Sequence, residues 1–174
     1  DETAAAGVDH TYGGSSTFSV GGGVAVFDCN GDGKPEMYLA GGGSSRAALY
    51  RNDSAVGGAF RFTVLHDPAT DLVDVIGAYP LDIDGDGNVD LAVLRVGENI
   101  LLRGLGGCRF ERANEALGFD GGKAQTTAFS ATWEGSGLPT LAVGNYLQLD
   151  AAGESGLDCD TSELIRPASG GTSY

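Results

Sequence analysis

Long apolar runs, basic residues and histidines are all scarce in this 174-residue sequence. No stretch of about 18–20 apolar residues occurs, so we expect no membrane span. Ten Lys and Arg stand against 24 Asp and Glu, which gives a formal net charge of −14. Phosphate binding needs clustered cations, so we expect neither nucleic acid nor an anionic membrane as a partner. The first residues show no positively charged leader, and the chain reads as mature or trimmed.

The usual nucleophile and base motifs are missing as well. His10 and His66 are the only histidines, and no G-x-S-x-G elbow or Cys/His pairing of familiar spacing is present. Catalysis by a pair of carboxylates stays possible, because the distance between two carboxyl groups is set by the fold and cannot be read from the sequence. We therefore expect a binding module rather than an enzyme.

The glycine and cysteine content limits the possible fold classes and disulfide pairings. Thirty glycines argue against long helices, since each Gly in a helix interior costs about 1 kcal/mol relative to Ala, while 41% hydrophobic residues provide a core. Three cysteines leave one unpaired within the chain, and we expect Cys159 to be the one that needs a partner outside it.

A nine-residue acidic loop at residues 82–90 carries the clearest chemical signal. The side chains of Asp82, Asp84 and Asp86, the carbonyl of Asn88 and the side chain of Asp90 stand at positions one, three, five, seven and nine. The negative charges of these carboxylates repel one another, and a cation bound among them would offset that repulsion. Hard oxygen donors at this spacing favour Ca²⁺, which takes six to eight oxygens and tolerates irregular geometry.

The loop resembles the first half of an EF-hand but not the second. An EF-hand needs a bidentate Glu at position twelve, within a helix. Here that position is Val93, inside an apolar run at residues 91–94 with strand character. The loop is therefore expected to join two strands.

A second loop of this kind lies at residues 28–36. Its expected ligands are Asp28, Asn30, Asp32, the Lys34 carbonyl and Glu36. The sequence thus predicts two structural Ca²⁺ ions. We expect weaker binding here than at residues 82–90, because three carboxylates stand beside Lys34 against four in the other loop, and ligand charge tunes affinity.

The loops belong to a repeat of strand, acidic loop and strand. We divide the chain into an irregular lead-in (1–20), a blade with a calcium loop (21–66), a second such blade (67–118), a degenerate partial blade (119–146) and a long insertion or start of missing blades (147–174). Strands are expected at about 23–28, 36–41, 47–52 and 60–64, then at 75–82, 90–95, 99–103 and 108–111, with a helical turn at 114–118. We expect no strand after Leu149.

The third repeat is recognised by register alone. Aligning its Leu-Ala-Val run with that of the second repeat places Thr132, Glu134, Ser136, Gly137 and Thr140 at the ligand and turn positions. Glu134 is then the only carboxylate, so we expect no calcium there. The three loops begin 54 and 50 residues apart, a spacing typical of propeller blades.

These motifs resemble the FG-GAP/VCBS repeats of integrin α-subunit β-propellers. The run from Val20 to Asp28, with Leu49 to Asn52 and Val143 to Tyr146, is more specifically similar to secreted propellers of the ASPIC/UnbV and cartilage-acidic-protein group. The resemblance implies a seven-bladed propeller whose calcium ions are structural.

The expected fold is therefore all-β, a partial β-propeller of about three four-stranded antiparallel blades with the third incomplete. Three blades cannot close a ring, since propellers normally have four to eight. The remaining blades are expected from the same protein or from a second chain. An open arc would expose apolar faces and strand edges.

The functional expectation is an exported protein, secreted or periplasmic, that recognises a protein or carbohydrate ligand. The alternative is part of a propeller enzyme, such as a polysaccharide lyase, hydratase or hydrolase, whose active site is completed by missing blades or a second chain. A purely structural spacer is a third reading. Trp133 could stack on a sugar, although its place at the start of an apolar strand favours the core. Asn52-Asp53-Ser54 is a glycosylation sequon if the source glycosylates exported proteins.

Overall fold

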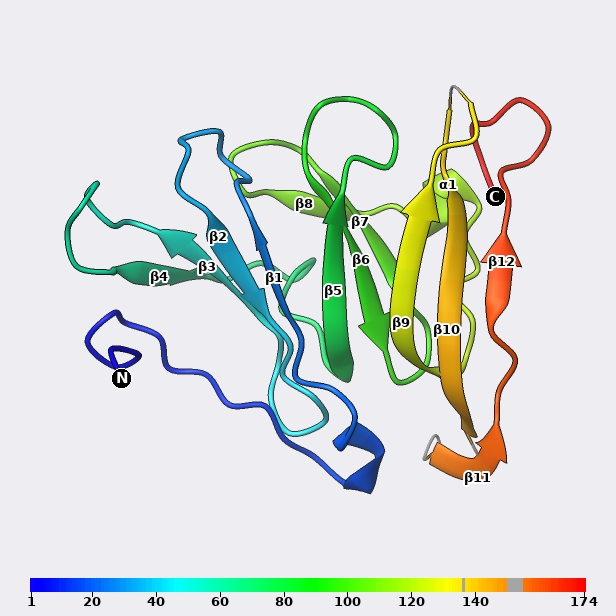
Figure 1. The fold of residues 1–174 in the computed structure, drawn as a ribbon, viewed down its shortest axis with the longest axis horizontal. Coiled ribbons are helices and arrows are strands. Elements are labelled where there is room, and N and C mark those ends of the chain that lie inside the picture. The colour runs from blue at the N-terminus through cyan, green and yellow to red at the C-terminus, as the bar shows by residue number, and fades with distance from the viewer. Residues whose placement is uncertain (136, 150–154) are drawn as a thin grey trace.

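The fold consists of three antiparallel β-sheets that lie side by side in chain order (Figure 1). We describe it from a computed structural model that covers residues 1–135, 137–149 and 155–174. Within these residues the helical structure is limited to a 3₁₀ turn (Ser16–Phe18) and one four-residue helix, α1 (Asn114–Leu117). The expected all-β class, a partial set of propeller blades, is confirmed.

The first two sheets are simple meanders. The first has the order β1 (Val24–Phe27), β2 (Glu36–Leu39), β3 (Ala48–Asn52) and β4 (Phe62–Leu65), and the second has the order β5 (Val75–Leu81), β6 (Asp90–Arg95), β7 (Ile100–Gly104) and β8 (Phe110–Arg112). All eight strands overlap the expected ranges. The expected helical turn is α1, which ends where Gly118 adopts a left-handed conformation with φ 65°.

The third sheet corrects one expectation. It contains β9 (Gln125–Thr132), β10 (Thr140–Leu149), β11 (Ser155–Cys159) and β12 (Glu163–Ile165). The expectation of no strand after Leu149 was wrong, since β11 and β12 both pair with β10, at opposite ends of the same edge. Strand β11 contains Ser, Gly and Asp, and β12 has only three residues, so neither segment has a strong strand preference of its own, and both become strands by pairing with the long β10. Asp150 and Glu154, expected within the insertion, lie outside the described residues.

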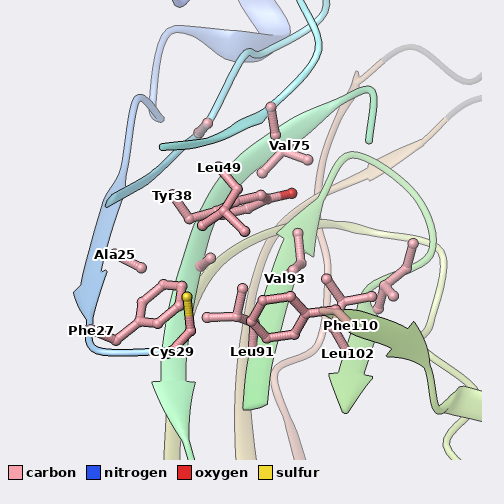
Figure 2. Close-up of a cluster of buried hydrophobic side chains, with 14 of the residues drawn as sticks. Ala25, Phe27, Cys29, Tyr38, Leu49, Val75, Leu91, Val93, Leu102 and Phe110 are labelled. Atoms are coloured by element: carbon pink, nitrogen blue, oxygen red, sulfur yellow. The ribbon is translucent and has the colours of Figure 1, made fainter. Parts of the chain in front are cut away.

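Two apolar layers hold the three sheets face to face. The first lies between the first and second sheets, where Phe27 and Phe110 meet edge to face with ring centroids 6.2 Å apart (Figure 2). The second layer includes Ala92 and Leu101 of the second sheet and Leu141 of the third. Strand β6 therefore contributes to both layers, which explains its uninterrupted apolar run. Such stacking of successive sheets is the packing of propeller blades.

The outer face of the first sheet is only partly covered. Residues of the N-terminal segment lie on it, and Tyr50 donates a hydrogen bond to the carbonyl of Asp9 (2.9 Å). Val24 and Val26, each 53% exposed, extend from the same face. Further blades are the expected cover for such a face. Among the described residues, no helix has the length and apolarity needed to cross a membrane.

Candidate metal centres

Both acidic loops connect the first two strands of a sheet. Residues 28–35 join β1 to β2, and residues 82–89 join β5 to β6. Glycines at the fourth and sixth loop positions have φ values of 75° and 77° in the first loop and 76° and 88° in the second. These left-handed conformations need glycine, because a Cβ would be strained there. The EF-hand alternative is thereby excluded, since each loop runs into a strand.

The two loops share one hydrogen-bond pattern. The first carboxylate, Asp28 or Asp82, accepts the backbone N–H groups of the fourth and sixth residues at 2.8–3.1 Å. The third side chain accepts the N–H of the fifth residue, and the fifth side chain accepts the N–H of the seventh. These bonds turn the side-chain oxygens of positions one, three and five inward on a preformed loop.

The donor set fits a calcium ion. One carboxylate oxygen from each of Asp82, Asp84 and Asp86 lies within 4.8 Å of the others. The N–H group of Gly33 and its neighbours lower the pKa of Asp28, and the N–H and amide of Asn88 lower that of Asp86. These two carboxylates, Asp28 and Asp86, are thus held ionised, as ligation of a hard divalent cation requires. A bound Ca²⁺ would supply the charge that offsets their mutual repulsion.

The ninth residue has a role that sequence reasoning missed. Asp90 is 1% exposed, and its two oxygens accept the N–H groups of Ile83 (2.8 Å) and Gly104 (2.7 Å). Burial, reinforced by Asp84 and Asp86, raises the pKa of Asp90 to about 6. The carboxylate therefore ties the second loop residue to the end of the third strand. Each oxygen keeps a second lone pair, so this role is compatible with the predicted ligation.

Glu36 repeats the arrangement in the first loop. It is fully buried and accepts the N–H groups of Cys29 (2.9 Å) and Asn52 (3.3 Å). Burial raises its pKa, and the charges of Asp28 and Asp32 add to the effect. Repetition of the same device identifies it as part of the repeat. The spacing alone could not distinguish an acceptor of backbone N–H groups from a ligand.

A basic side chain lies beside each loop. Lys34 Nζ is 3.2 Å from Asp32 Oδ2, and Arg103 Nε is 2.8 Å from Asp84 Oδ2. The Arg103 N–H is not aligned for a hydrogen bond, so this contact is an ion pair only. Arg103 comes from β7, which explains why the local sequence gave no sign of it. Each loop thus has one basic side chain in contact with it, and the second loop still has one carboxylate more than the first.

The third loop is organised differently. Glu134 Oε2 accepts a hydrogen bond from Thr140 Oγ1 (3.1 Å), and Arg166 Nη2 lies 3.4 Å from Glu134 Oε1. A guanidinium group from beyond β12 thus neutralises the one carboxylate of this loop. Ser136 lies outside the described residues. The expected lack of calcium at this loop stays a prediction.

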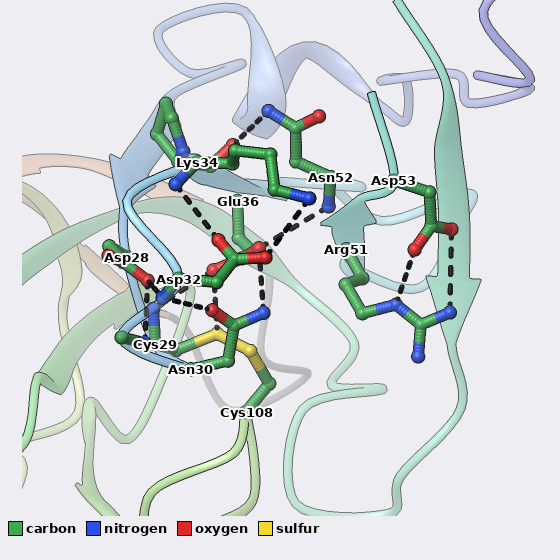
Figure 3. The surroundings of a disulfide bond; sticks show 12 residues. Asp28, Cys29, Asn30, Asp32, Lys34, Glu36, Arg51, Asn52, Asp53 and Cys108 are labelled. Atoms are coloured by element: carbon green, nitrogen blue, oxygen red, sulfur yellow. Dashed lines mark hydrogen bonds and ion pairs between the residues drawn. A yellow bond between two sulfur atoms is a disulfide. The ribbon is translucent and has the colours of Figure 1, made fainter. Parts of the chain in front are cut away.

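A disulfide anchors the first acidic loop. Cys29, the second loop residue, is bonded to Cys108 in the turn before β8 (Figure 3). The Cys108 N–H also donates to the Cys29 carbonyl (3.1 Å). Both cysteines are buried, whereas Cys159 is free and exposed. The expectation that Cys159 is the unpaired cysteine is confirmed. Both sulfurs beside Glu36 are in the disulfide, so this group offers no thiolate ligands.

The sequon is not exposed for modification in the folded chain. Asn52 is 7% exposed, and its amide nitrogen donates to the carbonyl of Pro35 (3.0 Å). Attachment of a glycan would require this nearly buried nitrogen to become accessible to the modifying enzyme.

Stacked four-stranded meanders with acidic loops between their first two strands define a propeller-type repeat. Residues 11–93 match the family model described as FG-GAP-like repeat, which supports an FG-GAP-like repeat in this segment of the chain. The match begins in the lead-in, covers the first sheet and both acidic loops, and ends within β6. No curated protein matches the chain.

Proposed function

We propose that this chain is a calcium-stabilised segment of an exported β-propeller that serves as a recognition module for a protein or carbohydrate. The observation that carries the proposal is the identical hydrogen-bond pattern of the two acidic loops, which holds hard oxygen donors on preformed turns. An FG-GAP-like repeat suggests a propeller-type recognition module, and such repeats are typically extracellular.

The calcium ions have a structural role in this proposal. Each loop joins two strands and is tied through its ninth residue to a third strand, so a bound ion would fix the end of the whole sheet. In both loops the expected ligand oxygens belong to a closed turn, the ninth carboxylates are occupied by backbone N–H groups, and neither loop contains a histidine, a hydroxyl or a free thiol. Catalytic metal sites keep an open position next to such groups.

Export supports calcium loading, because Ca²⁺ is abundant outside the cytosol, and the buried Cys29–Cys108 disulfide suits an oxidising compartment. Additional blades, from this protein or from another chain, would complete the ring and cover the exposed valines of β1.

Thermal unfolding of the chain with Ca²⁺, with Mg²⁺ and with chelator tests the metal assignment. We expect a higher melting temperature in Ca²⁺ than in Mg²⁺, and two bound ions by native mass spectrometry. Equal melting temperatures in all three buffers would contradict it. If the assembled propeller degraded a polysaccharide, the protein would be part of an enzyme, and the proposal of a pure recognition module would be wrong.

A further inference from the structure

An aromatic-lined groove of about 340 Å³ runs between β5 and β9. Its walls are residues 79–81 of β5, residues 129–131 of β9, and Trp133 just beyond β9. Trp133 is 49% exposed and Tyr79 is 38% exposed. The expectation that Trp133 belongs to the core was therefore wrong. The residue follows the last position of its strand, where the facing sheet no longer covers it.

The rings in the groove form a connected surface. The centroids of Tyr79 and Phe129 are 5.6 Å apart with an interplanar angle of 47°. Phe129 also packs against the apolar layer between the second and third sheets, which supports it from behind. Tyr79 is thus held by a partly buried neighbour while its own ring stays accessible. Aromatic side chains of this kind give large contact area at low entropic cost.

The chemistry of the lining selects an uncharged ligand. None of the lining side chains is charged. The hydroxyl groups of Tyr79 and Ser130 and the indole N–H of Trp133 have no hydrogen-bond partner among the described residues. The net charge of −14 further disfavours an anion. The groove therefore offers aromatic faces together with free donors and acceptors at its rim.

Packing between blades does not by itself require these aromatic residues. The corresponding groove between β1 and β5, about 550 Å³, is lined mainly by Gly, Val and Ala, and Tyr79 is its one aromatic lining residue. At that junction Phe27 of β1 packs inside the apolar layer, and neither Trp nor Phe lines the groove itself. Tyr79 borders both grooves, whereas Phe129 and Trp133 line the groove between β5 and β9 and not the one between β1 and β5.

We propose that the groove between β5 and β9 binds a ring of a neutral carbohydrate. The C–H face of a pyranose packs on the electron-rich face of Trp133 or Tyr79, and its hydroxyls both donate to and accept from the hydroxyls of Tyr79 and Ser130. This inference rests on the recognition role proposed above and names its ligand class. A proline-rich peptide also docks on aromatic grooves, but its prolines carry no N–H donor.

The single tryptophan of the chain makes the test direct, because any fluorescence change reports on the groove or its surroundings. The full chain would be titrated in calcium with cellohexaose, laminarihexaose and mannohexaose, and with trigalacturonic acid and decaproline for comparison. Isothermal calorimetry would then measure binding to Tyr79→Ala and Trp133→Ala. Tyr146→Ala is the matched control, since Tyr146 is 46% exposed on β10 and does not line the groove.

We expect a shift of Trp133 emission with at least one neutral oligosaccharide and none with trigalacturonic acid. Affinity should fall about tenfold or more in Tyr79→Ala and Trp133→Ala and stay unchanged in Tyr146→Ala, as for an aromatic group at the centre of a binding site. Three results would overturn the inference. They are sugar binding that survives both groove substitutions, binding of decaproline but of no sugar, and no binding of any neutral oligosaccharide at millimolar concentration.

Calcium-dependent melting of the same samples separates the two proposals. If melting still depends on Ca²⁺ while the sugars fail to bind, the groove assignment alone is wrong. If sugars bind but Ca²⁺ changes nothing, the metal assignment is wrong and the groove assignment stands. Unchanged melting temperatures of Tyr79→Ala and Trp133→Ala would show that lost binding is not lost folding.

Discussion

Removal of the Cys29–Cys108 disulfide should weaken calcium binding at the first loop and leave the second loop unaffected. Cys29 lies between the expected ligands Asp28 and Asn30, and its bond to Cys108 fixes the loop to the second sheet. The second loop has no such bond, because its equivalent residue is Ile83, which is held by apolar packing at 1% exposure. The two loops of one chain therefore provide a direct comparison.

The effect on stability can be estimated from the length of the closed loop. The two cysteines are 79 residues apart. In the chain-entropy model, cross-linking a loop of this size restricts the unfolded chain by about 4–5 kcal/mol, although measured losses for native disulfides spread over about 2–5 kcal/mol. Because domains unfold with about 5–15 kcal/mol, the change is large against the total.

The perturbation is the double substitution Cys29→Ala and Cys108→Ala, with Cys159→Ala as the control because Cys159 is free and exposed. Urea unfolding in chelator measures the stability loss without metal. To isolate each site, the double substitution is placed on Asp84→Ala, which leaves the first loop, and on Asp28→Ala, which leaves the second. Calcium-induced shifts in melting temperature are then compared with and without the disulfide.

We expect the calcium-induced shift to shrink on the Asp84→Ala background and to stay the same on the Asp28→Ala background. Equal shifts with and without the disulfide on both backgrounds would refute the reasoning that the disulfide preforms the first site. A shrinkage of both shifts would show a general loosening of the fold instead. The control Cys159→Ala should match the parent chain throughout.

Three further predictions use other parts of the structure. Asp84→Ala should lower the free energy of unfolding by more in calcium than in chelator, where the variant loses only the ion pair with Arg103 and the hydrogen bond from the Asp86 N–H. The difference between the two losses should be about 2.7 kcal/mol at a calcium concentration 100-fold above the dissociation constant of one site. The exposed Asp120→Ala should match the parent in both buffers, and equal losses for Asp84→Ala in calcium and in chelator would remove Asp84 from the ligand set. Glu36→Gln should lower the free energy of unfolding by about 1.5–3 kcal/mol in urea with chelator, because the amide turns its NH₂ toward a backbone N–H that the buried carboxylate accepts. A loss no larger than that of the exposed Glu111→Gln would argue against the role assigned to the ninth residue. Burial raises the pKa of Tyr38, whose hydroxyl donates to the carbonyl of Thr70 (2.8 Å). The stabilising contribution of the protonated Tyr38 is therefore complete below the unfolded pKa of about 10 and is lost as pH rises further. In urea unfolding between neutral and strongly alkaline pH, Tyr38→Phe should lose less stability at alkaline pH than the parent, and parallel pH profiles of the two proteins would contradict this expectation.

Much of the fold could be predicted from local signals. Short apolar runs separated by Gly, Asn and Asp clusters placed the eight strands of the first two sheets, because strand pairing there is between neighbours joined by short loops. The strands β11 and β12 were missed. Their pairing depends on the free edge of β10, and nothing in their own composition indicates it.

The candidate sites divide in the same way. The acidic residues at alternate loop positions, together with glycines suited to positive φ, were sufficient to predict two calcium loops and their expected ligands. The sequence could not show that Arg103 lies beside Asp84, since the two residues are brought together by the pairing of different strands. Nor could it show that Trp133 is exposed.

The sequence by itself determined the repeat, the all-β class and the conformation of the acidic loops, because each depends on residues that are close along the chain. Only the tertiary structure decided the partner of Cys29, the burial of the ninth carboxylates and the aromatic groove between β5 and β9. These depend on how whole sheets stack, and the distances between sheets are set by packing that no local pattern encodes.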